Sequence, residues 1–226
     1  RIAGAFLLLI MLLLLSLIWS ICSGSVSVPI MEFLQELREP KLRGMAWTII
    51  WEIRLPRALA ALILGGALAL SGYLLQTFFH NPIAGPFVLG ISSGSKLLVA
   101  LVMVGFLEWN ITINSGMLVA AAFAGALLSM LFVLLVARKM EQMAMLIVGG
   151  VMIGYICSAI TDFVVTFASD ADIVNLRNWS RGSFSGMTWE NVAVMVGVTF
   201  VSAAAVFLLS KPIGAYQMGE TYAKSI

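Results

Sequence analysis

AGAFLLLIMLLLLSLIWSI, from Ala3 to Ile21, is the stretch that decides the fold class. It contains no charged residue, and it is far longer than the roughly 10 residues of a membrane-spanning β-strand. In lipid, only α-helices and closed barrels satisfy every backbone hydrogen bond. Because its apolar residues are continuous, the stretch predicts a membrane-spanning helix. A signal peptide fits less well, since the apolar core is too long and no clear cleavage site follows.

The composition of the whole chain supports the same interpretation. Of its 226 residues, 61% are hydrophobic and 11% are charged, and the mean hydropathy is +1.04. A soluble domain has roughly 45–50% apolar and about 25% charged residues. This chain therefore has too few charges to cover a water-facing surface, and we expect lipid around most of it. The formal net charge of +2 gives no reason to expect nucleic acid as a partner.

Five further apolar segments resemble the first, and together they predict an all-α, polytopic transmembrane helical bundle. The six predicted spans are Ala3–Ile21, Ala58–Phe78, Ser93–Leu107, Gly116–Ala137, Met145–Phe167 and Val192–Leu209. The third span is the shortest. The basic residues between the spans do not follow the positive-inside rule, so charge leaves the orientation open.

Polar segments separate some of these spans. Residues 23–57 form a loop, extracytoplasmic if the N-terminus is cytoplasmic, in which apolar side chains recur at helical spacing, which predicts a short helix at the membrane interface. The apolar residues of this helix are Ile30, Phe33, Leu34 and Leu37. A second polar stretch, Ser169–Glu190, precedes the last span, and residues 210–226 form a polar tail.

Small residues recur four positions apart in three spans, which places each set on one stripe of its helix. The sets are Ala61, Gly65 and Ala69; Ala121, Gly125 and Ser129; and Gly150, Gly154 and Ser158. Close packing of helix backbones explains such stripes, and a ligand role is the alternative. We favour packing.

Ordered motifs resemble those of one transporter family. They begin with Arg54-Leu55-Pro56-Arg57, Leu70-Ser71-Gly72 and Gln76. They continue with Asn81-Pro82-Ile83-Ala84-Gly85-Pro86, Leu89-Gly90-Ile91-Ser92-Ser93-Gly94, Trp179-x-x-Gly182-Ser183-Phe184 and Met218-Gly219-Glu220-Thr221-Tyr222-Ala223-Lys224-Ser225-Ile226. In this order they resemble the FecCD-type permeases of ABC importers for iron-siderophores, haem and cobalamin.

The resemblance implies the fold of a type II ABC importer permease with ten membrane helices, of which six are present here. Residues 1–226 would be a single transmembrane permease domain, truncated at its C-terminus. It would act as a homodimer or paired permease in the cytoplasmic (inner) membrane of a bacterium. ATP-binding subunits and an extracytoplasmic substrate-binding protein would be its partners, and no cofactor is implied.

Arg54 and Arg57 are predicted to dock the substrate-binding protein. Pro56 suits the first turn of a helix, where two arginines three residues apart lie on one face but oppose the helix dipole. Such a pair calls for an external carboxylate, and the resemblance implies glutamates of the binding protein. Snorkelling of the two long side chains to the interface is the alternative.

Asn81-Pro82 and Gly85-Pro86 interrupt helical structure twice. At membrane depth, non-helical backbone is tolerated only where it is buried in protein or lines a cavity. The resemblance implies a translocation pathway that contains Gln76, Asn81, Pro82, Gly90, Ser92, Ser93 and Gly94. The alternative is a tight turn between helices with an N-cap at Ser92 or Ser93.

The tail resembles the start of the cytoplasmic segment that fits a cleft on the ATPase. This implies coupling roles for Gly219, Glu220 and Ala223. The chain has no G-x-x-x-x-G-K-[ST] phosphate loop, so we expect a transport subunit that is not an enzyme, with ATP hydrolysed by a partner. Neither Cys22 and Cys157 nor His80 has the spacing of a metal or redox site.

We therefore expect a permease subunit of an ATP-driven importer of iron-siderophore or related metal-chelate compounds. The alternative is an ion-coupled secondary transporter, which would need ionisable relays inside its spans. Asp162 is the main carboxylate candidate within a span, and alone it would make a poor relay.

Overall fold

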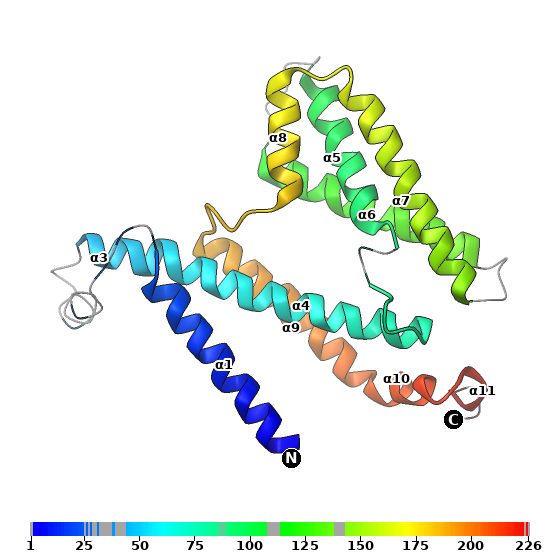
Figure 1. Cartoon of the computed structure of the whole chain (residues 1–226), viewed down its shortest axis with the longest axis horizontal. Helices are drawn as coiled ribbons and strands as arrows, with labels where there is room; N and C mark the ends of the chain where they lie inside the picture. The colour runs from blue at the N-terminus through cyan, green and yellow to red at the C-terminus, as the bar shows by residue number, and fades with distance from the viewer. Residues whose placement is uncertain are drawn as a thin grey trace. The chain divides into compact units, whose positions relative to one another are not determined.

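The computed structural model describes residues 2–24, 26, 28, 31, 38, 44–85, 87, 89–107, 114–137, 143–223 and 225. Over these residues all regular structure is helical, as predicted (Figure 1). The apolar residues of the predicted interfacial helix, from Ile30 to Leu37, lie outside the described residues. The chain divides into two compact units, Arg1–Leu68 with Phe184–Leu208, and Ala69–Ser183 with Leu209–Ile226.

Among its described residues, the first unit contains four helical elements and the start of a fifth. They are α1 (Ile2–Cys22), α3 (Met45–Trp47), the π-helical stretch η2 (Thr48–Arg54), α9 (Trp189–Leu208), and α4 (Leu55–Phe79) as far as Leu68. The Trp51 ring stacks on Trp47 with centroids 5.0 Å apart. The indole of Trp189 donates a hydrogen bond of 3.0 Å to the Trp51 carbonyl, which attaches the start of α9 to η2.

Where the structure describes it, the second unit contains the end of α4 and six further helices. They are α5 (Ile91–Leu107), α6 (Ser115–Ala137), α7 (Met143–Val165), α8 (Asp170–Arg181), α10 (Ser210–Gln217) and α11 (Glu220–Ala223). Helix α5 lies against both α6 and α7 (Figure 1). One apolar core joins Phe79 and Leu89 to α6 and α7, and another joins α5 to Leu176 and Trp179 of α8.

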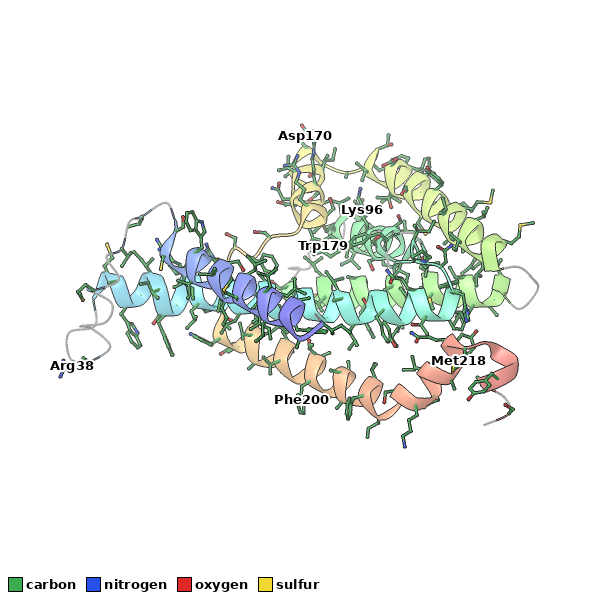
Figure 2. All side chains as sticks on the ribbon, turned by 60° about the horizontal axis from the view of Figure 1, so that its bottom comes forward. Arg38, Lys96, Asp170, Trp179, Phe200 and Met218 are labelled. Carbon is green, nitrogen blue, oxygen red and sulfur yellow. The ribbon has the colours of Figure 1, made fainter. Side chains whose placement is uncertain are left out.

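In the part of the chain that the structure describes, five helical stretches are long and apolar enough to cross a membrane, and α5 is a shorter apolar helix. The long stretches are Ile2–Cys22, Met45–Phe79, Ser115–Val136, Met145–Val165 and Trp189–Leu208. Together with α5 they match the six predicted spans. Their surfaces are apolar: Phe200 of α9 is 71% exposed and points away from its helix (Figure 2). This pattern suits helices surrounded by lipid.

The predicted start of the second span is wrong. Sequence reasoning placed the second span at Ala58–Phe78 and took Pro56 to mark the first turn of its helix. In the structure, helical residues run without a break from Met45 to Phe79. In an α-helix, the ring of Pro56 would clash with the carbonyl four residues earlier. The preceding stretch widens into a π-helix, in which the Leu55 N–H donates to the Ile50 carbonyl, and such bulges accommodate a proline.

Two further helices lie in segments that the sequence marked only as polar. The hydroxyl of Ser169 accepts a hydrogen bond from the Asp172 N–H and caps α8, which ends at Gly182 with φ of +73°. After α9 ends at Leu208, α10 begins at Ser210. Pro212 cannot donate to a carbonyl four residues earlier, so it ends one helix and fits the first turn of the next.

Candidate functional site

The two predicted docking arginines lie in different surroundings. The Arg54 side chain is 9% exposed, and its Nη1 donates to the carbonyls of Ile21 at 2.9 Å and Cys22 at 3.1 Å. Its Nη2 donates to the Val26 carbonyl. A Cβ at Gly24 would lie 2.7 Å from that nitrogen, so the absence of a side chain there makes room for the guanidinium. Arg54 therefore caps the C-terminal end of α1.

Arg57, one turn further along α4, is exposed. The helix-dipole argument for this pair does not hold, because both arginines lie inside a continuous helical stretch and not at its first turn. The docking role itself stays a prediction. Of the two arginines, Arg57 has the exposed side chain, so its charge is the one that a binding protein could contact.

The end of α4 has an unusual cap. The His80 N–H donates to the Thr77 carbonyl at 3.3 Å, and the Asn81 N–H donates to the Gln76 carbonyl at 3.2 Å, which is the Schellman pattern. His80 occupies the left-handed position with φ of +48°, where glycine is usual. A side chain in this conformation costs about 1 kcal/mol. The Oδ1 of Asn81 then accepts from the Ile83 N–H at 3.0 Å and turns the chain away.

A polar cavity of about 380 Å³ lies at this end of α4. Its lining residues are Tyr73, Gln76, Thr77, His80, Asn81, Pro82 and Gln217. The cavity thus brings together three of the predicted pathway residues, Gln76, Asn81 and Pro82. Sequence reasoning missed the other four. A signal was present, because positions 73, 76, 77 and 80 form a polar stripe at helical spacing in an otherwise apolar span.

The remaining pathway candidates lie elsewhere, at the start of α5. Gly90 has φ of +71°, and a Cβ on it would lie 2.7 Å from both the Gly150 carbonyl oxygen and the Gly154 nitrogen. A Cβ on Gly94 would lie 2.6 Å from the Ser129 hydroxyl and 2.8 Å from the Gly125 carbonyl. Gly90 and Gly94 therefore allow close contact of α5 with α7 and α6.

We call this contact region the small-residue seam. Its members are Gly90, Gly94, Gly125, Ser129, Gly150 and Gly154. The Ser129 hydroxyl donates to the Gly90 carbonyl at 3.1 Å within it. For the members on α6 and α7, the packing interpretation of the small-residue stripes is confirmed. Ser92 is exposed and Ser93 is half-buried beside Gly154.

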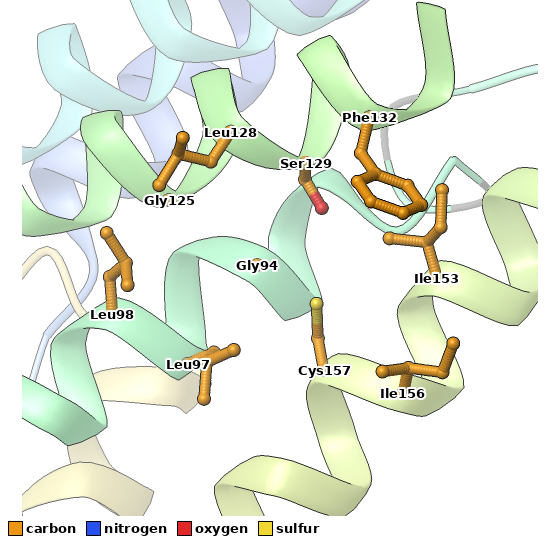
Figure 3. Close-up of a pocket in the computed structure, with 10 residues that line it drawn as sticks. All are labelled: Gly94, Leu97, Leu98, Gly125, Leu128, Ser129, Phe132, Ile153, Ile156 and Cys157. Atoms are coloured by element: carbon orange, nitrogen blue, oxygen red, sulfur yellow. The ribbon is translucent and has the colours of Figure 1, made fainter. Parts of the chain in front are cut away.

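An apolar pocket of about 200 Å³ borders the seam (Figure 3). Ser129 and Cys157 project toward it among leucine, isoleucine and phenylalanine side chains from three helices. The Cys157 thiol is half-buried and free. Such a lining suits hydrocarbon, and over the described residues no group of three His, Cys, Asp or Glu side chains is placed to hold a metal ion.

The predicted coupling residues lie around a sharp turn. Gly219 separates α10 from α11 with φ of +123°, a conformation that side chains rarely adopt. Its carbonyl accepts from the Ala223 N–H at 3.0 Å, so it forms the start of α11. The backbone of Glu220 belongs to α11. These coupling roles stay predictions.

Comparisons with known proteins agree with the resemblance found in the sequence. The sequence profile of the FecCD transport family matches residues 12–226. The vitamin B12 import system permease protein BtuC of Klebsiella pneumoniae subsp. pneumoniae is 36% identical over 219 residues, which cover 96% of this chain and 62% of that protein. The protein of the same name from Citrobacter koseri is 33% identical over 216 residues, with coverages of 95% and 62%.

A solved structure described as an inward-facing metal-chelate type ABC transporter has the same fold. Its TM-score is 0.79 at 24% sequence identity, and the match covers 99% of this chain and 67% of that one. This chain spans 62% of the length of the two BtuC relatives. Because the family profile matches nearly all of it, this multi-pass membrane protein belongs to the FecCD transport family.

Proposed function

We propose that the protein is the permease subunit of an ATP-driven importer of metal-chelate compounds in a bacterial cytoplasmic membrane. The observation that carries this proposal is the profile match over residues 12–226 together with relatives that are vitamin B12 import permeases. Two permease chains would enclose the pathway, and separate ATPase subunits would hydrolyse ATP. Transport would then follow from differential stabilisation of conformational states and not from covalent chemistry.

The cargo class we propose is iron-siderophore complexes, haem or cobalamin. The polar cavity supports contact with a hydrated cargo, because its wall offers hydroxyl, amide and imidazole groups and no carboxylate among the described lining residues. Groups of this kind can donate hydrogen bonds to a bulky polar solute and accept hydrogen bonds from it.

The cargo is tested by uptake into proteoliposomes that contain the permease, its ATPase and its binding protein. Radiolabelled cyanocobalamin and ferrichrome serve as the two probes. ATP-dependent accumulation of either probe supports the proposal and selects the cargo. A matched preparation with a hydrolysis-deficient ATPase should accumulate neither. Uptake that persists in that preparation would favour an ion-coupled secondary transporter and would overturn the proposal.

Docking of the binding protein is tested at Arg57. We expect Arg57→Glu to weaken the Kd of the binding protein about tenfold, because the substitution turns attraction toward an acidic surface into repulsion. Lys211→Glu, an equal charge change at an exposed position of α10, serves as the control. Equal affinities for wild type and Arg57→Glu would remove the docking role.

The proposal also requires Arg57 and the Gly219 turn to lie on opposite sides of the membrane. In a variant whose Cys22 and Cys157 are replaced by alanine, single cysteines introduced at residue 57 and at the exposed position 218, next to Gly219, can be labelled from outside sealed vesicles with a membrane-impermeant maleimide. Labelling of only one of the two is expected. Labelling of both from the same side would contradict the assignment of docking and coupling ends.

A further inference from the structure

Within the second unit, side chains of α10 attach directly to the last two turns of α4. The Nε2 of Gln217 donates to the Tyr73 hydroxyl at 3.1 Å and to the Thr77 hydroxyl at 3.0 Å. A glutamine amide carries two N–H donors, and positions 73 and 77 are one helical turn apart on α4. One side chain therefore connects two successive turns of α4 to the end of α10.

A second connection runs in the opposite direction, from α4 to α10. The Nε2 of His80 lies 3.1 Å from the Tyr216 carbonyl. A carbonyl oxygen only accepts, so the imidazole carries its proton on Nε2 and donates it. The same carbonyl also accepts from the Gly219 N–H at 3.1 Å. His80 thus contributes to capping the end of α10, where helix carbonyls lack partners within their own helix.

Ring contacts support this arrangement. The Tyr216 ring stacks on Phe78 with centroids 6.0 Å apart and an interplanar angle of 9°. It also lies 5.2 Å from the His80 ring. Five residues take part in the three hydrogen bonds described above, Tyr216 through its main-chain carbonyl and the others through their side chains. We call them the polar link: Tyr73, Thr77, His80, Tyr216 and Gln217.

Apolar packing alone does not require these groups. Leu74 and Phe78 of α4 line an apolar pocket together with Pro212 and Ile213 of α10. Contact between such apolar side chains would hold the two helices together, but it would not fix the position of one helix along the other. Hydrogen bonds are directional, so the polar link fixes the position of α10 along α4. The left-handed backbone of His80, unusual for a residue with a side chain, directs the imidazole into this contact.

The position of the polar link gives it a function. Its members Tyr73 and Thr77 of α4, and His80 directly after α4, line the polar cavity together with Gln217. Its α10 members, Tyr216 and Gln217, come directly before the Gly219 turn and the proposed coupling segment. We propose that His80 and Gln217 are positioning residues that transmit movement of the coupling segment to the cavity wall, an inference that rests on the proposed function.

The test uses the complete transporter in proteoliposomes and measures probe uptake per ATP hydrolysed. Gln217→Met keeps the length of the side chain but removes its donors, and His80→Ala removes the imidazole. We expect each substitution to lower this ratio about tenfold, within the usual range of coupling between sites, while ATP hydrolysis continues. Lys211→Ala, on the same short helix but outside the polar link, should leave the ratio at the wild-type value.

Conservative variants separate positioning from general folding. Gln217→Glu replaces the donors by acceptors for the Tyr73 and Thr77 hydroxyls, so it should retain most of the coupling that Gln217→Met loses. His80→Asn keeps a donor and a residue type that tolerates the left-handed conformation. A wild-type ratio in Gln217→Met and His80→Ala would overturn the inference. So would equal losses in Gln217→Met and Gln217→Glu.

A second readout does not depend on the cargo. Hydrogen exchange of residues 74–85 is compared before and after the ATPase is trapped with Mg-ATP and vanadate. In wild type the trapped state should alter exchange in this segment, and in Gln217→Met the change should be confined to residues 209–223. If neither probe is taken up by wild type, the proposed function fails, while this measurement still decides whether the two segments are connected. An unchanged response in Gln217→Met would refute the connection.

Discussion

The small-residue seam and the polar link both hold helices together in the same unit, but by opposite means. In the seam, glycines let backbones approach until a single Cβ would lie 2.3 Å from a carbonyl oxygen, as at Gly125. In the polar link, long side chains bridge two helices through hydrogen bonds of 3.0–3.1 Å. The seam is in tight backbone contact, whereas the link depends on mostly exposed polar side chains whose partners water can replace. The difference suggests a rigid α5–α6–α7 body and an adjustable α4–α10 contact.

The largest expected effect comes from a substitution in the seam. Gly125→Val would place its Cβ against the backbone of Gly94, so α5 and α6 would have to separate, at a cost of about 3 kcal/mol. The thermal midpoint and folded yield in detergent measure this loss. Gly105→Ala, at a glycine of α5 with open space around it, is the matched control and should be neutral. A stable Gly125→Val protein would disprove the rigid seam.

Arg54 shares features of both regions, being polar like the link and buried like the seam. We expect Arg54→Ala to lower stability by about 2 kcal/mol, because it leaves carbonyls at the end of α1 without a donor. Thermal unfolding reports the release of α1. Arg57→Ala, one turn away and exposed, should leave it unchanged. If Arg54→Ala weakens binding-protein affinity while unfolding is unchanged, Arg54 is a docking residue and not a cap.

A smaller effect is expected at the one hydroxyl of the seam. Ser129→Ala removes its hydrogen bond to the Gly90 carbonyl, at a cost of about 1 kcal/mol. That carbonyl keeps the Gly94 N–H as a partner at 3.0 Å, which limits the loss. Chemical unfolding in mixed micelles measures the change. A loss as large as that of Gly125→Val would mean that the hydroxyl, and not the spacing, holds the seam.

The smallest stability change is expected in the polar link. Gln217→Met should cost less than about 1 kcal/mol, because Gln217 is exposed and water can replace its partners. The thermal midpoint should therefore be nearly that of wild type, even though coupling is reduced. A midpoint shift as large as that of Ser129→Ala would indicate that the polar link stabilises the fold. The link and the seam would then not differ in their contribution to stability.

Much of the architecture could be predicted from local patterns. Continuous apolar runs identified the six spans, because the free energy of moving a helix from water into lipid depends mainly on which side chains it carries. The small-residue stripes of α6 and α7 were interpreted as packing, and their contacts agree. The start of the second span was misplaced because Pro56 was taken as a helix start. Whether a proline begins a helix or is absorbed by a π-turn depends on the preceding residues, here Thr48–Arg54.

The candidate site was predicted only in part. Family-like motifs drew attention to Gln76, Asn81 and Pro82, which do share a cavity wall. The same reasoning grouped Gly90 and Gly94 with them, and the structure places both in the seam; their pathway role stays a prediction. In the sequence, a glycine that lines an open pathway and a glycine that allows a close helix contact look the same when both lie near a helix break. Only their neighbours in space distinguish the two.

The sequence by itself determined that this chain is a bundle of membrane helices with the ordered motifs of the FecCD transport family, because hydropathy and local motifs are properties of consecutive residues. Tertiary structure alone decided that Arg54 caps α1 and that His80 and Gln217 connect α4 to α10. Each of these contacts joins residues 28 to 144 positions apart. Hydrogen-bond partners at such separations follow from how helices pack, which no local pattern encodes.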